Sequence, residues 1–114
     1  MSELATFNVE NYKRVALITV SGRVDSSNAS QLEDALAGVL DEGQKNLVLE
    51  LSGLDYLSSA GLRYLVSTLK DCRKRGGDLR IASPSERVDE VLRMAGLKSL
   101  FATYEDTTAA VGSF

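Results

Sequence analysis

The chain has 114 residues, 44% hydrophobic and 25% charged, which is the ordinary composition of one globular domain. Thirteen basic against sixteen acidic side chains give a net charge of −3, which argues against a nucleic-acid-binding protein with a basic face. The absence of histidine excludes Ser–His and Cys–His nucleophile pairs, histidine-ligated zinc and the most common general base near neutral pH.

The first half of the chain predicts two strands, a helix and a third strand. The expected ranges are residues 7–12, 15–20, 30–43 and 46–51. Apolar residues that recur every three or four positions indicate the helix, which has a capping box of Ser30 and Glu33 at its start and Gly43 at its end. The third strand is almost continuously apolar, as expected of an interior strand that is covered on both faces.

The second half predicts a long helix, a short strand, a helix, a strand and a final helix. The expected ranges are residues 59–75, 79–82, 83–96, 100–104 and 105–114. The long helix has a regular apolar stripe and ends at a double glycine, Gly76-Gly77. The next helix is expected to begin with Ser83 as its N-cap, Pro84 as its first residue and Glu86 as its third.

These elements follow the order ββαβαβαβα, with a turn expected over residues 52–58 before the long helix. Strands that alternate with helices favour mostly parallel pairing through right-handed crossovers, here after an antiparallel first hairpin. The sequence therefore predicts one α/β domain, residues 1–114, built on a mixed and mostly parallel β-sheet.

The chain lacks the segments that would place it in a membrane or outside the cell. No apolar run approaches the roughly 18 residues that span a bilayer, and the first residues have no signal-peptide pattern. The single cysteine, Cys72, fits a reducing compartment. The acidic residues are not spaced as metal ligands, and no glycine-rich phosphate loop is present. We therefore expect a cytoplasmic protein with no metal, no cofactor and no membrane insertion.

Two adjacent serines, Ser58 and Ser59, stand at the expected start of the long helix. Free backbone N–H groups and the helix dipole favour negative charge there, so a phosphate on either hydroxyl would be held locally and would change the surface that a partner meets. Serine is also the commonest helix cap, which is the alternative interpretation of the pair. Ala60 and Gly61 leave little side chain beside the hydroxyls, which indicates close approach by another protein.

A polar loop after the second strand contains Asp25, Ser26 and Asn28. Loops that follow parallel strands gather at one edge of a sheet, so this loop and the segment from Asp55 to Ser59 are expected to share one surface. A phosphate among these carboxylates would meet like-charge repulsion as well as dipole attraction. The alternative interpretation is again a helix start, because aspartate and asparagine are good caps.

Three blocks of the sequence resemble the bacterial anti-sigma factor antagonists, which are single-domain members of the STAS group. The blocks are VALITVSGRVDSSNASQLEDAL, LVLELSGLDYLSSAGLRYLV and GGDLRIASPSERVDEVLRMAGL. The second block is the most specific, because it joins a strand, a turn, paired serines, Gly-Leu and an amphipathic helix. The resemblance covers nearly the whole chain and implies a sheet flanked by helices on one side.

The resemblance also implies partner switching without catalysis by the antagonist. In this family the unphosphorylated antagonist binds an anti-sigma factor, which is also a serine kinase of the histidine-kinase-like ATPase type, and frees the sigma factor. Phosphorylation of a serine at the start of the second helix abolishes this binding, and a serine phosphatase restores it. The resemblance thus implies a regulator of transcription, which we expect to be a monomer or a weak dimer.

The serine pair departs from the family pattern by one position. The best-known members read Asp-Ser-Ser-Gly-Leu here, with the acceptor serine directly before the glycine. A gapless match places Ala60 on the acceptor, Ser59 on the preceding serine and Ser58 on the aspartate. The modified hydroxyl is therefore predicted to be that of Ser59, with Ser58 as the second choice, unless the switch has been lost.

Two classes of function stay open. The first is a regulatory module that docks on a kinase-type anti-sigma factor, and its predicted partner-binding residues are Asp25, Ser26, Asn28, Asp55, Ser58, Ser59, Ala60, Gly61 and Arg63. The second is an unphosphorylated interaction subunit of a transport or stress-signalling complex, which the alanine at the acceptor position favours. A small enzyme or NTPase is the least favoured, because the sequence shows no base, metal cluster or phosphate loop.

Overall fold

The computed structural model describes residues 5–114, and its core is one six-stranded mixed sheet. The strands are β1 (Ala5–Asn11), β2 (Ala16–Val24), β3 (Asn46–Glu50), β4 (Leu54–Leu57), β5 (Asp78–Ala82) and β6 (Thr103–Tyr104). Five strands lie in the order β1-β2-β3-β5-β6, and β4 pairs with the last part of β2. As predicted, β1 and β2 form an antiparallel hairpin and the remaining pairs are parallel.

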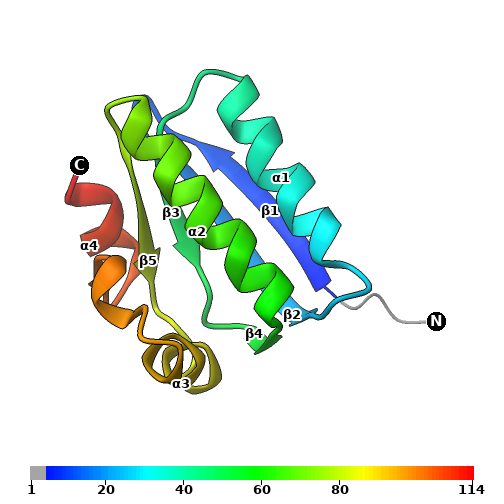
Figure 1. Cartoon of the computed structure of the whole chain (residues 1–114). Helices are drawn as coiled ribbons and strands as arrows, with labels where there is room; N and C mark the ends of the chain where they lie inside the picture. The colour runs from blue at the N-terminus through cyan, green and yellow to red at the C-terminus, as the bar shows by residue number, and fades with distance from the viewer. Residues whose placement is uncertain (1–4) are drawn as a thin grey trace.

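Helices cover the sheet unequally on its two faces. They are α1 (Ala29–Asp41), α2 (Ser59–Lys74), α3 (Glu86–Met94), the 3-10 helix η1 (Lys98–Leu100) and α4 (Thr107–Gly112). Figure 1 shows α1 and α2 side by side across one face, and buried residues of α1, α2 and α3 share one core with that face. The predicted α/β architecture, with a mixed sheet and helices packed on it, is confirmed. The prediction of helices on one side only was wrong, because the short helix α4 forms a second, smaller core on the opposite face.

The two cores explain why the interior strands are almost continuously apolar. In β3, Leu47 and Leu49 enter the larger core, whereas Val48 between them enters the smaller core under α4. All three side chains have no exposed surface. The prediction of an interior strand covered on both faces is thus confirmed, and the alternation of side chains along a strand is the reason.

The segment before the long helix differs from the prediction, because residues 54–57 form the strand β4 and not a turn. Four residues are too few to show a period, and the strand exists only because β2 continues past β3. The register between β2 and β4 shifts at a bulge between Gly22 and Arg23. This extra strand sets where α2 begins.

Two predicted helix starts are wrong by two residues or fewer. The helix α1 begins after Asn28, so Ser30 lies inside the first turn and does not cap it. The helix α3 begins after Ser85, whose Oγ accepts the N–H of Val88 at 3.2 Å and donates to the backbone oxygen of Leu54 at 2.6 Å. Ser83, the predicted cap, has a φ of 49°, so it belongs to the turn before the helix.

The end of the chain contains less strand than predicted. Residues 98–100 form η1, so only Thr103 and Tyr104 of the predicted strand 100–104 pair with β5. The final helix occupies residues 107–112 of the predicted 105–114, because Asp106 caps it by accepting the N–H of Ala109 at 2.8 Å.

Candidate functional site

Parallel pairing of β2 with β4 brings the two predicted loops together. Val24 and Leu57 are register partners at the ends of these strands, so Asp25 and Ser58 follow at neighbouring positions. The N–H of Ser58 donates to the backbone oxygen of Val24 at 2.8 Å, which closes the gap between the two segments. The expected shared surface is thus confirmed for the loop from Asp25 and the start of α2. It is not confirmed for Asp55, which lines a separate hollow beside α3.

Ser58 is the N-cap of α2. Its Oγ accepts the N–H of Gly61 at 3.1 Å, and its backbone oxygen accepts the N–H of Leu62 at 2.9 Å. The side chain satisfies one of the amides that a helix start leaves unpaired, and the residue is only 9% exposed. The hydroxyl of Ser58 is therefore engaged in the cap and is shielded from solvent.

Ser59 is the first residue of α2 and is exposed. It lines a surface groove of about 700 Å³ that runs along the outer side of α2. Two chemically identical neighbours thus differ in access, because the chain turns into the helix between them. Only Ser59 of this pair presents a hydroxyl that another protein's active site can reach.

Gly61 is buried on the inner side of the first turn of α2. The sequence had predicted that it would leave an open surface beside the serine hydroxyls. A Cβ at this position would lie 2.8 Å from Leu57 Cδ1 and 2.8 Å from Val24 Cγ1. The glycine therefore permits close packing of α2 on β2 and β4 within the chain. Ala60 is half-buried and packs against the same core. The interpretation of Gly61 as a site of close approach by a partner was wrong.

The loop after β2 is held by its own side chains. Asp25 Oδ1 accepts the hydroxyl of Ser27 at 2.6 Å and its N–H at 2.9 Å, and these bonds lower the pKa of Asp25 below its usual value. Asn28 is 3% exposed, and its side chain accepts the N–H of Asp25 at 2.8 Å and donates to the backbone oxygen of Arg23 at 2.9 Å. Asn28 thus orders the loop, while Ser26 is left exposed.

Asp55 and Arg63 lie on different surfaces. Asp55 is exposed on β4 and lines a shallow hollow with Ser85 and Arg87 at the start of α3. Arg63 is exposed one turn after Ser59 and lines the same groove. Of the two, only Arg63 extends the surface that begins at Ser59.

A model of the STAS domain family matches residues 6–110 of the chain. The chain belongs to the STAS domain family. It is similar to BtrV of Bordetella bronchiseptica, a protein named for anti-sigma factor antagonism, with 39% identity over 95 residues that cover 83% of this chain and 82% of BtrV. It is also similar to the anti-sigma-B factor antagonist of Staphylococcus aureus, with 29% identity over 90 residues that cover 79% and 83%.

A solved structure agrees with this assignment of the STAS domain. The crystal structure of an anti-sigma factor antagonist from Mycobacterium paratuberculosis superposes with a TM-score of 0.85 and 28% identity. The match covers 96% of this chain and 92% of that one. The residues that the family model matches include β4, α2 and the loop after β2, so the candidate site lies within the STAS domain.

Sequence reasoning missed part of the groove of this STAS domain. Its further lining residues include Tyr64, Val66, Ser67, Lys70, Lys74 and Leu97. Those on α2 occupy the side opposite its buried stripe, so helical spacing from Ser59 could have identified them. Leu97 could not have been found in this way, because it follows α3 and reaches α2 only through the fold.

Within residues 5–114, no group of three or more acidic or cysteine side chains is arranged to hold a metal ion. In the same range, no helix is both long and apolar enough to cross a membrane.

Proposed function

We propose that this STAS domain is an anti-sigma factor antagonist that acts by partner switching. The unphosphorylated form binds an anti-sigma factor that is also a serine kinase of the histidine-kinase-like ATPase type, and this frees the sigma factor. A phosphate on Ser59 abolishes the binding, and a serine phosphatase restores it. The names of BtrV and of the S. aureus relative support the proposal. The observation that carries it is the exposed Ser59 beside the buried cap Ser58.

The position of Ser59 suits a reversible negative charge. A phosphate at the first residue of α2 would lie at the positive end of the helix dipole, so the folded domain would tolerate it. The same phosphate carries a charge of about −1.5 to −2 and would add this negative charge to the docking surface. Asp25 adds to this effect, because its carboxylate is also negatively charged at neutral pH. Phosphorylation would thus alter binding without unfolding the domain.

We propose that residues 1–114 form one regulatory domain that has no catalytic residues or cofactors of its own. The kinase and the phosphatase supply the chemistry, and the domain supplies the hydroxyl and the surface. We propose that it works in the cytoplasm as a monomer or a weak dimer. Asp25, Ser26, Ser59 and Arg63 would contact the anti-sigma factor directly, whereas the buried Asn28 and Ser58 would hold these residues in place.

Phosphate transfer and binding with purified components test the proposal. The domain would be mixed with ATP and, one at a time, with each histidine-kinase-like anti-sigma factor encoded in the same genome, and any phosphate located by mass spectrometry. We expect modification of Ser59 by one of them, and an affinity for that protein that Ser59→Asp lowers by about tenfold or more. Ser59→Ala is the matched control and should bind as tightly as the wild type. Phosphate found only on Ser58 would refute the assignment to Ser59.

A second function has one observation in its favour. The family's usual acceptor position is occupied by Ala60, which has no hydroxyl and is half-buried against the core. An unphosphorylated subunit of a transport or stress-signalling complex would need no acceptor there. Failure of every candidate kinase to modify the domain, together with stable binding to such a complex, would favour this second function.

A further inference from the structure

The outer side of α2 carries a surface that the serine switch does not by itself explain. The groove starts at Ser59 and continues to Lys74 at the last turn of the helix. We propose that this groove docks an acidic amphipathic helix of the anti-sigma factor. The inference rests on the proposed function and adds the chemistry of the docked segment.

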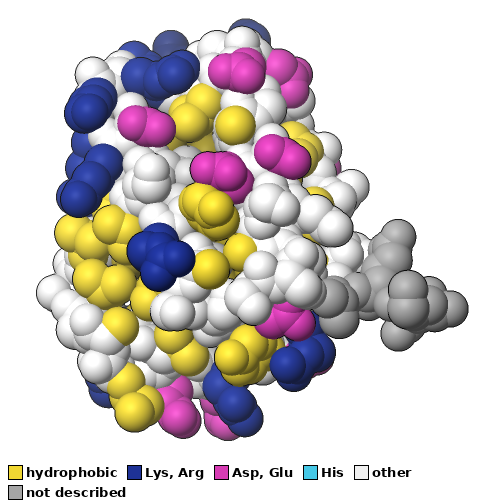
Figure 2. Space-filling view, turned by 45° about the vertical axis from the view of Figure 1, so that its right-hand side comes forward, with side chains coloured by type: hydrophobic (Ala, Val, Ile, Leu, Met, Phe, Trp, Pro, Cys, Tyr) yellow, Lys and Arg dark blue, Asp and Glu magenta, His cyan; other side chains and the backbone are white. Residues whose placement is uncertain are grey.

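The side of the groove toward η1 is apolar. Leu62 and Val66 of α2 line it together with Leu97, which precedes η1. Val66 and Leu97 are only half-buried, so they keep apolar surface for a partner to cover. Figure 2 shows hydrophobic side chains gathered over a broad area at the left of this face, with Lys and Arg side chains beside and above them. An apolar strip bordered by cations is the complement of an acidic amphipathic helix.

The basic side chains of the groove form one line along α2. Arg63, Lys70 and Lys74 stand seven and four residues apart, so they share the outer side of the helix over about 16 Å at 1.5 Å per residue. Within residues 5–114 these three side chains form no ion pair and no hydrogen bond. They therefore remain free to pair with carboxylates of a partner.

This basic line is unusual in an acidic protein. The chain as a whole has a net charge of −3, and the neighbouring helix α1 contains three acidic residues and no basic residue. The groove also includes Glu33 and Asp71, but its three cations outnumber these two carboxylates. Acidic side chains on a partner would be attracted to α2 and repelled from α1, which would fix the position of the docked segment.

The same arrangement explains how a phosphate on Ser59 would act over a long interface. Ser59 and Arg63 lie at i and i+4 on α2 and line the same end of the groove. A phosphate there would add negative charge where the acidic segment begins and would compete for Arg63. The phosphate therefore needs no change of fold to expel the partner.

Charge reversal in the groove, with matched controls elsewhere, tests the inference. Lys70→Glu and Lys74→Glu would be compared with Lys13→Glu and Lys45→Glu, which make the same change at exposed lysines outside the groove. Affinity for the anti-sigma factor that binds the wild type would be measured by calorimetry at low and at moderate salt. We expect about a tenfold loss for each groove variant and less than about twofold for each control, with the difference shrinking as salt rises.

Failure of the groove inference and failure of the proposed function give different results. If the wild type binds and Ser59→Asp prevents binding, but groove and control variants bind alike, the inference is overturned and the proposed function stands. If the wild type binds none of the anti-sigma factors, both are overturned. Hydrogen exchange provides a second measurement: protection of α2 and Leu97 in the complex supports the groove, whereas protection confined to the opposite face of the sheet overturns it.

Discussion

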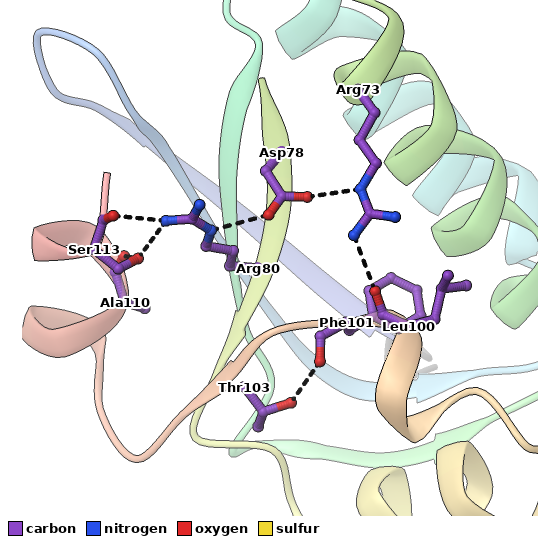
Figure 3. A network of polar contacts seen from close by, with 8 residues as sticks. All are labelled: Arg73, Asp78, Arg80, Leu100, Phe101, Thr103, Ala110 and Ser113. Atoms are coloured by element: carbon purple, nitrogen blue, oxygen red, sulfur yellow. Dashed lines mark hydrogen bonds and ion pairs between the residues drawn. The ribbon is translucent and has the colours of Figure 1, made fainter. Parts of the chain in front are cut away.

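The two ends of α2 are held in different ways. At its start the helix is anchored by main-chain contacts, the Ser58 cap and the close packing of Gly61, and the neighbouring hydroxyl of Ser59 stays exposed. At its end, charged side chains connect the helix to three other elements (Figure 3). The contrast indicates which end of the helix can accept a modification.

Asp78 on β5 is the centre of the connections at the end of α2. Its Oδ1 pairs with Arg73 Nε at 3.2 Å, and its Oδ2 pairs with Arg80 Nε at 3.0 Å. Arg73 also donates to the backbone oxygen of Leu100 at 3.1 Å, and Arg80 donates to the Oγ and backbone oxygen of Ser113 at 2.8 Å each. Both oxygens of Asp78 are thus occupied, and the cluster also contacts Leu100 of η1 and Ser113, which directly follows α4.

The difference has a simple consequence for regulation. A charge added at the end of α2 would disturb ion pairs that join several elements, so it would alter stability. A charge added to Ser59 would meet unpaired amides and solvent, so it would alter the surface alone. A regulatory site is therefore expected at the start of the helix, and four predictions test this contrast.

The largest effect is expected from an alanine at Gly77, next to the end of α2. A Cβ there would lie 2.1 Å from the backbone oxygen of Lys45, which cannot move without disturbing the sheet. At Gly61 the nearest atoms are the side-chain ends of Leu57 and Val24, at 2.8 Å. We expect Gly77→Ala to lower the free energy of unfolding by about 3 kcal/mol and Gly61→Ala by about 1 kcal/mol, measured by urea denaturation. A larger loss for Gly61→Ala than for Gly77→Ala would contradict the proposed difference between the two ends of α2.

The second effect is a dependence of stability on alkaline pH through Cys72, in the last turns of α2. Burial raises the pKa of this thiol from 9.0 to about 11, and the nearby carboxylates of Asp78 and Asp71 add to the rise. The folded state thus holds the proton more tightly than the unfolded state, so the stabilisation is complete below pH 9 and is lost as the pH rises toward 11.

By pH 11 this difference in pKa between the folded and unfolded thiol is worth about 2 kcal/mol. Unfolding free energies from pH 8 to pH 11 would be compared between the wild type and Cys72→Ala. We expect the wild type to lose stability faster than the variant in this window. Parallel curves would show that the thiol does not contribute.

The third effect concerns the ion pairs at the end of the helix. Asp78→Ala removes the partner of two arginines at once, and the side chain of Asp78 is only 19% exposed. We expect a loss of about 1–2 kcal/mol that becomes smaller at high salt. Asp34→Ala, at an exposed position on α1, is the matched control and should cost less than about 0.5 kcal/mol. Equal losses for Asp78→Ala and Asp34→Ala would show that the ion pairs of Asp78 do not stabilise the fold.

The smallest effect separates the two serines. Ser58→Ala removes the cap of α2 and should lower the midpoint of thermal unfolding, with a loss of about 1 kcal/mol. Ser59→Ala removes an exposed hydroxyl and should change stability by less than about 0.5 kcal/mol. A larger loss for Ser59→Ala than for Ser58→Ala would reverse the roles assigned to the two hydroxyls.

Much of this fold follows from local pattern in the chain. The apolar residues Leu62, Leu65, Leu69 and Cys72 recur at helical spacing, and all four are buried in α2. Glycines mark the ends of helices where φ is positive, as at Gly76. Such signals are local, because a helix or a buried strand must place its apolar residues on one side or on both sides.

The strand β4 and the start of α3 could not be predicted in this way. Residues 54–57 include the exposed Asp55 and have no strand period, and they pair only because β2 continues beside them. By sequence Ser83 is the better cap, because Pro84 then takes the first position of the helix. Ser85 is the cap because its hydroxyl also reaches the backbone oxygen of Leu54 on β4.

The chain alone therefore determined the class of fold, the family and a pair of serines at one helix start, because these depend on residue types and spacing. It did not determine which serine is exposed. That choice depends on where α2 leaves β4, and the pairing of Leu57 with Val24 sets this point. The groove beyond Ser59 likewise includes Leu97, which the tertiary structure brings beside α2 from a distant part of the chain.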